Sequence, residues 1–204
     1  PDPIPVYAEM GSINPFFILP GALKERAESI AEGLKNSVTL GSGQFCTCPG
    51  LAVGVAGDNF DRFKKVLGEM ISEAPAATML YPGILQAYNE GITRLSTIDG
   101  LDIIKSKQPA DSSRTQCSPA MLSTSAEILI QHPGLSEEVF GPSTVLVSCK
   151  SIEEMERIAR GLQGHLTATI HGTEEDLKEQ HSLISIIEDK VGRLVFNGYP
   201  TGVE

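Results

Sequence analysis

Positive charge is scarce in this sequence of 204 residues, which holds 16 Lys and Arg against 26 Asp and Glu and has a net charge of -10. Proteins that bind nucleic acid neutralise phosphates with Lys and Arg, and segments that bind anionic lipid cluster the same residues beside the membrane. The sequence contains no such basic cluster, and no apolar run approaches the roughly 20 residues of a membrane span. We therefore expect neither a nucleic-acid partner nor a membrane partner.

Cysteine is also scarce, and tryptophan is absent. The four cysteines are Cys46, Cys48, Cys117 and Cys149, too few for a disulfide scaffold in a chain of this size. The first residues, Pro1 to Pro5, lack the basic start and apolar core of a secretory signal. We expect free thiols in a reducing, cytoplasmic setting. None of the four histidines has a partner at ligand spacing, so we expect no metal site.

Apolar strand-like runs alternate with amphipathic helical stretches along the chain. Strands are expected at residues 16–19, 51–55, 143–149, 166–171 and 193–197. Helices are expected at residues 23–34, 58–71, 82–96, 151–162 and 173–190. Asp58 is the expected cap of the second helix, Ser151 and Glu154 have the spacing of a capping box, and a polar loop is expected near residues 108–115. Alternating strands and helices predict parallel pairing in a layered α/β domain.

The first candidate for chemistry is a glycine-rich loop, residues 41–50, that carries Cys46 and Cys48 between a helix and a strand. A nucleophilic thiol needs access and nearby backbone donors, and glycines let N–H groups approach an oxyanion closely. The alternative is a pair of partly buried structural thiols in a turn, because cysteine is among the residues most often buried.

Two other segments carry acids in unusual surroundings. Glu9 is the single acid in a glycine-punctuated, otherwise apolar strand end, where a carboxylate can act as a general base; the alternative is an exposed surface glutamate. Glu137 and Glu138 precede Phe140 and a Gly-Pro turn that leads into a strand. The alternative for that segment is a polar loop with Phe140 packed into the core.

Taken together, these segments resemble the catalytic-domain signatures of the aldehyde dehydrogenase superfamily. The signatures are E-x-G-S at residues 9–12, G-Q-F-C-T at 43–47 and E-E-V-F-G-P at 137–142, and they occur in the family's order. The residues at 43–47 and at 196–202 are similar to those of the family branch that oxidises α-ketoglutaric semialdehyde. The resemblance implies a layered α/β/α catalytic domain with a mostly parallel sheet over residues 1–204.

The resemblance also implies roles for individual residues. Cys46 would be the nucleophile that forms a thiohemiacetal and then a thioester, and Glu9 the general base. Glu138 would hold the nicotinamide ribose of NADP or NAD, and Phe140 would lie beside the nicotinamide ring. The family's side-chain oxyanion donor is not Asn14, which follows Glu9 in a different motif.

The sequence holds no G-x-G-x-x-G segment and no P-loop, and it begins without Met, so it has the character of one piece of a longer chain. We expect the piece alone to be inactive and the intact enzyme to be a homo-oligomer acting on a small aldehyde. The alternative function is a non-catalytic α/β binding or assembly module that keeps the fold. A thiol hydrolase using Cys46 and a histidine has no support from the positions of the four histidines.

Overall fold

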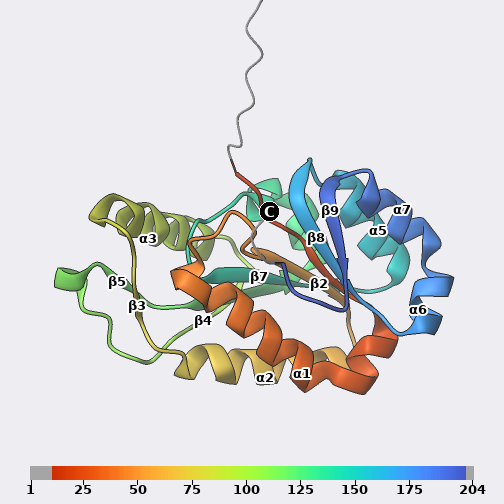
Figure 1. The fold of residues 1–204 in the computed structure, drawn as a ribbon, viewed down its shortest axis with the longest axis horizontal. Helices are drawn as coiled ribbons and strands as arrows, with labels where there is room; N and C mark the ends of the chain where they lie inside the picture. Colours follow the sequence, from red (N-terminus) through yellow and green to blue (C-terminus); the bar gives the residue numbers. More distant parts are fainter. Residues whose placement is uncertain (1–10, 201–204) are drawn as a thin grey trace, which may run out of the picture.

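A mixed sheet of seven strands forms the centre of the fold in the computed structural model, which describes residues 11–200 (Figure 1). In spatial order the strands are β4 (Asp102–Lys105), β6 (Ala120–Ser125), β7 (Ser143–Cys149), β2 (Leu51–Val55), β1 (Phe16–Ile18), β8 (His165–His171) and β9 (Val191–Phe196). Only the pairing of β4 with β6 is antiparallel in this sheet of the described chain. A second, two-stranded sheet joins β3 (Ala77–Thr78) to β5 (Gln116–Cys117). The predicted α/β fold with a mostly parallel sheet is confirmed.

Helices cover both faces of the large sheet. The α-helices are α1 (Pro20–Thr39), α2 (Asp58–Glu73), α3 (Pro82–Ser96), α4 (Ala126–Gln131), α5 (Ile152–Gly161), α6 (Glu174–Glu179) and α7 (His181–Glu188). Three short 3-10 helices are η1 (Leu40–Gly43), η2 (Ser112–Arg114) and η3 (Pro133–Ser136). Helices α1 and α2 pack together under one face, and α5 and α7 lie over the other (Figure 1).

Strand β1 shows how the two hydrophobic layers arise. Successive side chains of a strand point to opposite faces of the sheet. Phe16 and Ile18 belong to the cluster under α1 and α2, and Phe17 between them belongs to the cluster that includes α3, α4, α5 and α7. All three are fully buried, so β1 lies at the centre of the domain.

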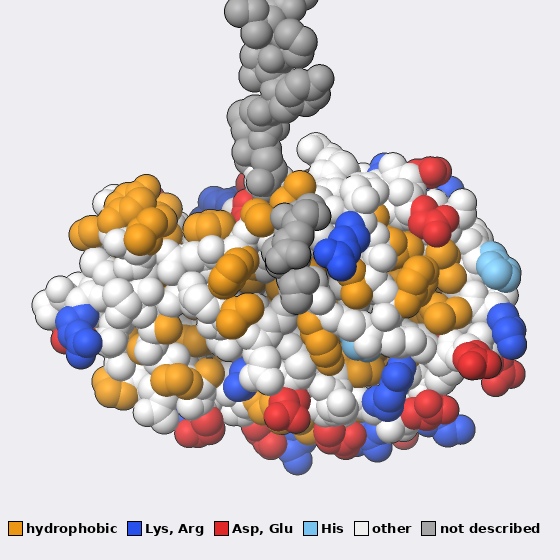
Figure 2. Space-filling model, viewed as in Figure 1, with side chains coloured by type: hydrophobic (Ala, Val, Ile, Leu, Met, Phe, Trp, Pro, Cys, Tyr) orange, Lys and Arg blue, Asp and Glu red, His pale blue; other side chains and the backbone are white. Residues whose placement is uncertain are grey.

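Charged side chains lie mainly on the outer faces of helices. Figure 2 shows Asp and Glu side chains mixed with Lys and Arg along the edge occupied by α1 and α2. Apolar side chains gather instead over α3, at the other end of the molecule (Figure 2). Between residues 11 and 200, no helix is both long enough and apolar enough to cross a membrane.

The predicted cap of α2 is wrong. Asp58 is the first helical residue, the flanking position is Gly57 with a φ of 145°, and no side-chain hydrogen bond caps this helix. A φ in this range is strained for residues with a Cβ, which explains the glycine. Asp58 instead lies in the first turn, where its negative charge favours the positive end of the helix.

Two further details of the helices differ from prediction. The helix expected over residues 173–190 divides into α6 and α7 at Gln180, whose backbone is non-helical. Ser151 accepts a bond from the Glu154 N–H as expected, but the Glu154 carboxylate accepts from the Lys150 N–H and not from the Ser151 N–H. A full capping box is present at Thr173 and Asp176.

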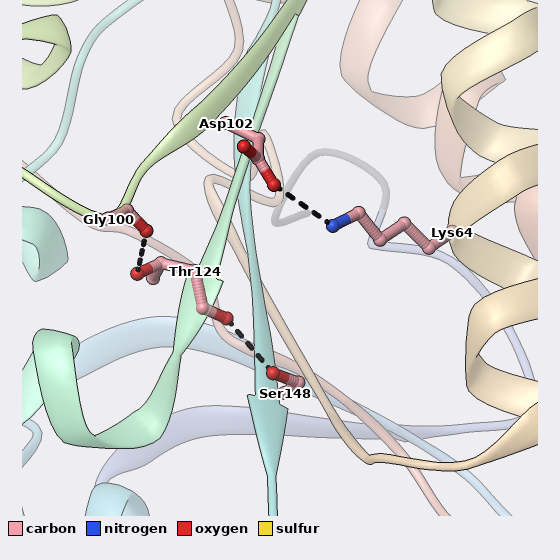
Figure 3. A network of polar contacts seen from close by, with 5 residues as sticks. All are labelled: Lys64, Gly100, Asp102, Thr124 and Ser148. Atoms are coloured by element: carbon pink, nitrogen blue, oxygen red, sulfur yellow. Dashed lines mark hydrogen bonds and ion pairs between the residues drawn. The ribbon is translucent and has the colours of Figure 1, made fainter.

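The pattern along the chain did not predict β4 and β6, which lie between residues 102 and 125. A polar network joins this region to its neighbours (Figure 3). The Thr124 hydroxyl donates to the Gly100 carbonyl at 3.1 Å, the Ser148 hydroxyl donates to the Thr124 carbonyl at 3.2 Å, and Lys64 pairs with Asp102. Because β6 contains Ser and Thr in buried positions, its sequence lacks the apolar run that marks β2 and β7.

Candidate functional site

The candidate site lies at the amino ends of four adjacent parallel strands. Strands β7, β2, β1 and β8 are neighbours in the sheet and run in the same direction. The three predicted motifs end just before β1, β2 and β7, so the sheet aligns the segments 11–14, 41–50 and 137–142 along one edge. Ligands of open α/β sheets usually bind at the carboxyl ends of strands, so this edge is the less common location.

The loop with Cys46 follows a tight left-handed turn. Gly41, Ser42 and Gly43 have φ values of 53°, 59° and 67°. The Ser42 hydroxyl donates to the Thr78 carbonyl at 3.0 Å, and the Gln44 side chain accepts from the Leu80 N–H at 2.8 Å. Cys46 is half-buried at the tip of this loop, and it is a free thiol.

The same loop packs against the Gly-Pro turn of the third motif. A Cβ on Gly43 would overlap the main-chain carbonyl of Gly141, so the two glycines let the backbones touch. On the other side of the turn, the buried Tyr88 hydroxyl donates to the carbonyls of Ser118 and Pro142 at 2.9 and 3.4 Å. Burial raises the pKa of Tyr88, so this hydroxyl keeps its proton and remains a donor.

Asn14 connects the Cys46 loop to the sheet. Its side chain is 1% exposed, and its amide nitrogen lies 2.8 Å from the Cys46 carbonyl, 3.0 Å from the Cys48 carbonyl and 3.1 Å from the Ser12 carbonyl. Its amide oxygen accepts from the Ser12 hydroxyl and from the N–H and hydroxyl of Thr167 in β8. Its φ is 49°, a left-handed conformation that asparagine tolerates well.

Ser12 brings the first and third motifs together. Its N–H donates to Oε2 of Glu138 at 3.2 Å, across 126 positions of sequence. A Cβ on the neighbouring Gly11 would lie 3.0 Å from the same oxygen, and the φ of Gly11 is 132°. The glycine therefore leaves room for the Glu138 carboxylate beside the end of the Glu9 motif.

Glu138 lines two open clefts and one small pocket of about 20 Å³. One cleft, of about 470 Å³, is lined by Gly11, Ser12, Glu137, Glu138 and His165 among others. The second, of about 610 Å³, lies between α3 and the 138–140 segment. Phe140 borders this second cleft and is 38% exposed, so the alternative of a core-packed Phe140 is wrong.

Cys48 has a structural environment. It is buried, its sulfur faces the carbonyls of Val38 and Gly141, and burial together with the Glu138 charge raises its pKa to about 12. Burial also raises the pKa of Cys117 to about 11 and that of Cys149 to about 12. All four cysteines are free. Cys48 is therefore a buried structural thiol, which was the alternative interpretation of the glycine-rich loop.

The histidines near the sheet are kept neutral by burial. Burial, and then the Lys190 charge, lowers the pKa of His165, whose Nδ1 accepts from the Ile13 N–H at 3.4 Å. Burial lowers the pKa of His171 to about 4, and its Nε2 lies 2.9 Å from the Gly198 carbonyl. Among residues 11–200, no group of three or more His, Cys, Asp or Glu side chains is arranged to hold a metal ion.

The fold separates three arginines that are able to bind a carboxylate. Arg62 pairs with Glu28 in the layer of α1 and α2, and Arg114 is exposed in η2. Arg94 lines the cleft beside Phe140, where it pairs with Glu137 at 3.2 Å. Arg94 is therefore the one of these three that borders the candidate site.

The four predicted site residues have different outcomes. Cys46, Glu138 and Phe140 lie on segments that the fold brings to one edge of the sheet. Glu9 lies outside the described residues. The sequence did not single out Ser12 or the structural part played by Asn14; its one signal was Asn-Pro before an apolar run, which is typical of a turn.

Two curated dehydrogenases match the whole of this chain. The chain is 42% identical over 204 residues to alpha-ketoglutaric semialdehyde dehydrogenase 2 of Azospirillum brasilense, a match that covers 100% of this chain and 39% of that protein. It is 38% identical over 208 residues to alpha-ketoglutaric semialdehyde dehydrogenase of Acinetobacter baylyi, with the same coverage. Over its whole length the chain is therefore similar to about two fifths of each of these two dehydrogenases.

Solved aldehyde dehydrogenase structures share the fold at lower identity. Succinic semialdehyde dehydrogenase from Streptococcus pyogenes, solved with NADP+, gives a TM-score of 0.77 at 20% identity over 96% of this chain and 42% of that one. An NAD-dependent aldehyde dehydrogenase from Sinorhizobium meliloti gives 0.75 at 18% identity over 96% and 38%. No protein-family model matches the chain. The chain thus spans about two fifths of the length of the two curated relatives it matches.

Proposed function

We propose that this chain is the catalytic domain, residues 1–204, of an NAD(P)-dependent aldehyde dehydrogenase in which Cys46 is the nucleophile. The observation that carries the proposal is the meeting of three motifs at one sheet edge. The half-buried Cys46 thiol lies on a loop that touches the Gly141 turn, and Glu138 on that same segment is bound to Ser12. The other three thiols lie in buried environments that favour the protonated form.

The proposed chemistry uses the thiolate of Cys46. Its sulfur attacks the aldehyde carbon, the carbonyl oxygen becomes an oxyanion, and the product is a thiohemiacetal. The Cys46 N–H is one proposed donor to that oxygen. Loss of a hydride from the same carbon leaves a thioester, and attack of water then releases the carboxylate and the thiolate. Glu9, outside the described residues, is the proposed base that takes the proton from the thiol or the water.

The described residues fit one end of a nicotinamide cofactor. Ribose hydroxyls donate to a carboxylate, and the Glu138 carboxylate lies at the border of two clefts with Ser12 holding one oxygen. The Phe140 ring is partly exposed at the second cleft, which suits contact with a planar ring. A bound NAD or NADP would accept the hydride. The sequence holds no glycine-rich phosphate-binding segment, so we expect the chain alone to lack turnover.

We propose α-ketoglutaric semialdehyde as the substrate, on the printed names of the two curated relatives. Its carboxylate needs a cationic partner. Arg94 borders the site but is paired with Glu137, so the described residues do not single out that partner. A homo-oligomeric intact enzyme and a cytoplasmic location stay predictions.

A chimera tests the proposal. The 204 residues replace the matching 39% of the Azospirillum enzyme, and oxidation of α-ketoglutaric semialdehyde is followed by NADH or NADPH absorbance. We expect an active chimera and loss of turnover in Cys46→Ser, with Cys48→Ser, a second thiol of the same loop, as the matched control that stays active. A folded chimera without activity, or an active Cys46→Ser variant, contradicts the proposal and favours the non-catalytic module.

A further inference from the structure

We propose that Asn14 is a positioning residue that fixes the main chain of Cys46 relative to Glu138. The inference rests on the proposed function, because it assigns a role within the proposed site. No part of the proposed chemistry involves the Asn14 side chain directly. Its contacts are with the peptide groups and side chains that hold the reacting loop.

The first argument compares the donors and acceptors of the Asn14 side chain with the groups around it. An amide side chain offers two N–H donors and one oxygen with two lone pairs. The Asn14 amide nitrogen faces three carbonyls, and the shortest of the three separations, 2.8 Å, is to Cys46. Two N–H donors are therefore shared among three carbonyls. The amide nitrogen binds the Cys46 loop, and the amide oxygen binds Thr167 in β8.

The second argument is chemical. Asparagine is the side chain of this length that both donates to carbonyls and accepts from N–H and O–H groups. Aspartate would place an anion against the carbonyls of Cys46 and Cys48, which are the negative ends of their dipoles. Leucine would leave those carbonyls and Thr167 without their partner, which is unfavourable because unpaired polar groups inside a protein lose their hydrogen bonds to water.

The third argument is the link to Glu138. Asn14 contacts the carbonyl and the hydroxyl of Ser12, and the Ser12 N–H holds Oε2 of Glu138. One side chain thereby fixes the Cys46 peptide on one side and the residue that orients Glu138 on the other. A shift of Asn14 would move the nucleophile and the proposed ribose contact relative to each other.

The test compares three variants of the chain. Asn14→Ala removes both the donors and the acceptor. Thr167→Val removes one hydroxyl that donates to the Asn14 oxygen but keeps the donation from Asn14 to Cys46. Thr124→Val is the matched control, because it removes a buried side-chain bond in β6 while its position, four residues from the amino end of that strand, is about 13 Å from the site edge.

The first measurement needs no enzymatic activity. The folded chain is alkylated with iodoacetamide, and the adduct at Cys46 is followed by mass spectrometry. Because the half-buried thiol becomes more accessible when its loop is released, we expect Asn14→Ala to react about tenfold faster at Cys46, while Thr167→Val and Thr124→Val stay within about twofold of the wild type. Equal rates in Asn14→Ala and Thr124→Val, compared where both variants are folded, overturn the inference.

The second measurement uses the chimera. A misplaced reacting group lowers the rate of chemistry, and displacement by about 1 Å can cost roughly 100-fold. We expect Asn14→Ala to lower kcat by about that factor with KM for the aldehyde within about threefold, and Thr124→Val to change neither. A loss of kcat no larger than that of Thr124→Val overturns the positioning role. An inactive wild-type chimera refutes the proposed function instead, and the alkylation rates then decide the inference alone.

Discussion

Oδ1 of Asp176 accepts a hydrogen bond of 3.0 Å from the N–H of Gly21, so a residue of α6 caps the first turn of α1, 155 positions earlier in the sequence. Its Oδ2 accepts from the Ala22 N–H at 3.0 Å and from the Thr173 N–H at 2.8 Å. The first N–H groups of a helix have no partner within the helix, and a carboxylate there also favours the positive end of the helix dipole. One side chain therefore satisfies the amino ends of two helices.

We predict that Asp176→Ala lowers the free energy of unfolding by about 2 kcal/mol, because it removes a cap and bonds to a charged acceptor. Urea denaturation followed by circular dichroism measures the change. Glu175→Ala is the matched control: this neighbouring acid is exposed, and we expect a change within about 0.5 kcal/mol. Equal stability of the two variants would show that the bonds to α1 contribute nothing.

The Cys46 loop and the Gly141 turn touch through glycines, and this contact is tested by Gly43→Ala. The φ of Gly43 is 67°, and a Cβ would overlap the Gly141 carbonyl. Left-handed backbone costs other residues about 1–2 kcal/mol, and the overlap with backbone adds to it. We predict a loss of at least about 2 kcal/mol, or a loop that moves out of place.

Gly161→Ala is the control for that substitution. Gly161 is the last residue of α5, and a Cβ there meets nothing within 4 Å. Alanine stabilises a helical position by about 0.5–1 kcal/mol relative to glycine, so this variant should melt at a higher temperature. Two variants of equal stability would contradict the close approach of the two backbones.

The thiols should differ sharply in reactivity. A group with a pKa of about 12, such as Cys48 or Cys149, is thiolate in about one molecule in ten thousand near pH 8. Cys46 is the half-buried member of the set, whereas the other three are buried. We predict that iodoacetamide labels Cys46 first in the folded chain, as mapped by mass spectrometry.

Cys46→Ser should abolish that fast labelling and leave the slow labelling of the others unchanged. In urea all four thiols should react at similar rates, because burial no longer separates them. Labelling of Cys117 or Cys149 as fast as Cys46 in the folded chain would contradict the prediction and weaken the assignment of the nucleophile.

The burial of His171 predicts that the free energy of unfolding decreases in acid. Its pKa is 6.5 in the absence of its surroundings and about 4 in the fold, chiefly through burial. Below about pH 6.5 the unfolded chain binds a proton that the folded chain refuses, so stability falls as the pH falls toward about 4. The loss from this one group is on the order of 2 kcal/mol by about pH 5 and 3 kcal/mol by about pH 4.

The measurement is urea denaturation at neutral pH and at a pH near 5, in wild type and in His171→Phe. Phenylalanine keeps a ring against Phe16 and Tyr199, whose centroids lie 4.8 and 5.2 Å from the imidazole, and it removes the titration. We expect a smaller acid-induced loss in this variant. His181→Gln, at an exposed histidine, should retain the loss of the wild type.

The sequence predicted the central strands of the large sheet better than the edge formed by β4 and β6. Strands β2 and β7 were predicted to the residue because their apolar, β-branched runs end at Gly or polar positions. Strand β6 was missed because Ser123 and Thr124 interrupt its apolar pattern, although both are buried. The Thr124 hydroxyl is satisfied by the carbonyl of Gly100, which lies 24 positions away in the sequence. Local sequence carries no information about such distant partners.

In the candidate site, too, local sequence predicts single residues but not the contacts between distant ones. Cys46, Glu138 and Phe140 were predicted as site residues from short motifs. The motifs did not predict that Ser12 would hold Glu138 or that Asn14 would hold Cys46, since those bonds depend on the register of β1 against β2 and β8. The difference in burial between Cys46 and Cys48 also depends on the fold. The two residues lie in one loop, but the Cys48 side chain is buried and the Cys46 side chain is half-buried.

The location of the site at the amino ends of the strands leaves the opposite edge of the sheet free for engineering. Strand β2 ends at Val55, and Ala56 just beyond it is exposed. A fluorophore or an affinity tag inserted there would lie about 16 Å, the length of a five-residue strand, from the loop that carries Cys46. The sheet thus insulates a reporter from the chemistry while keeping the two at a fixed separation.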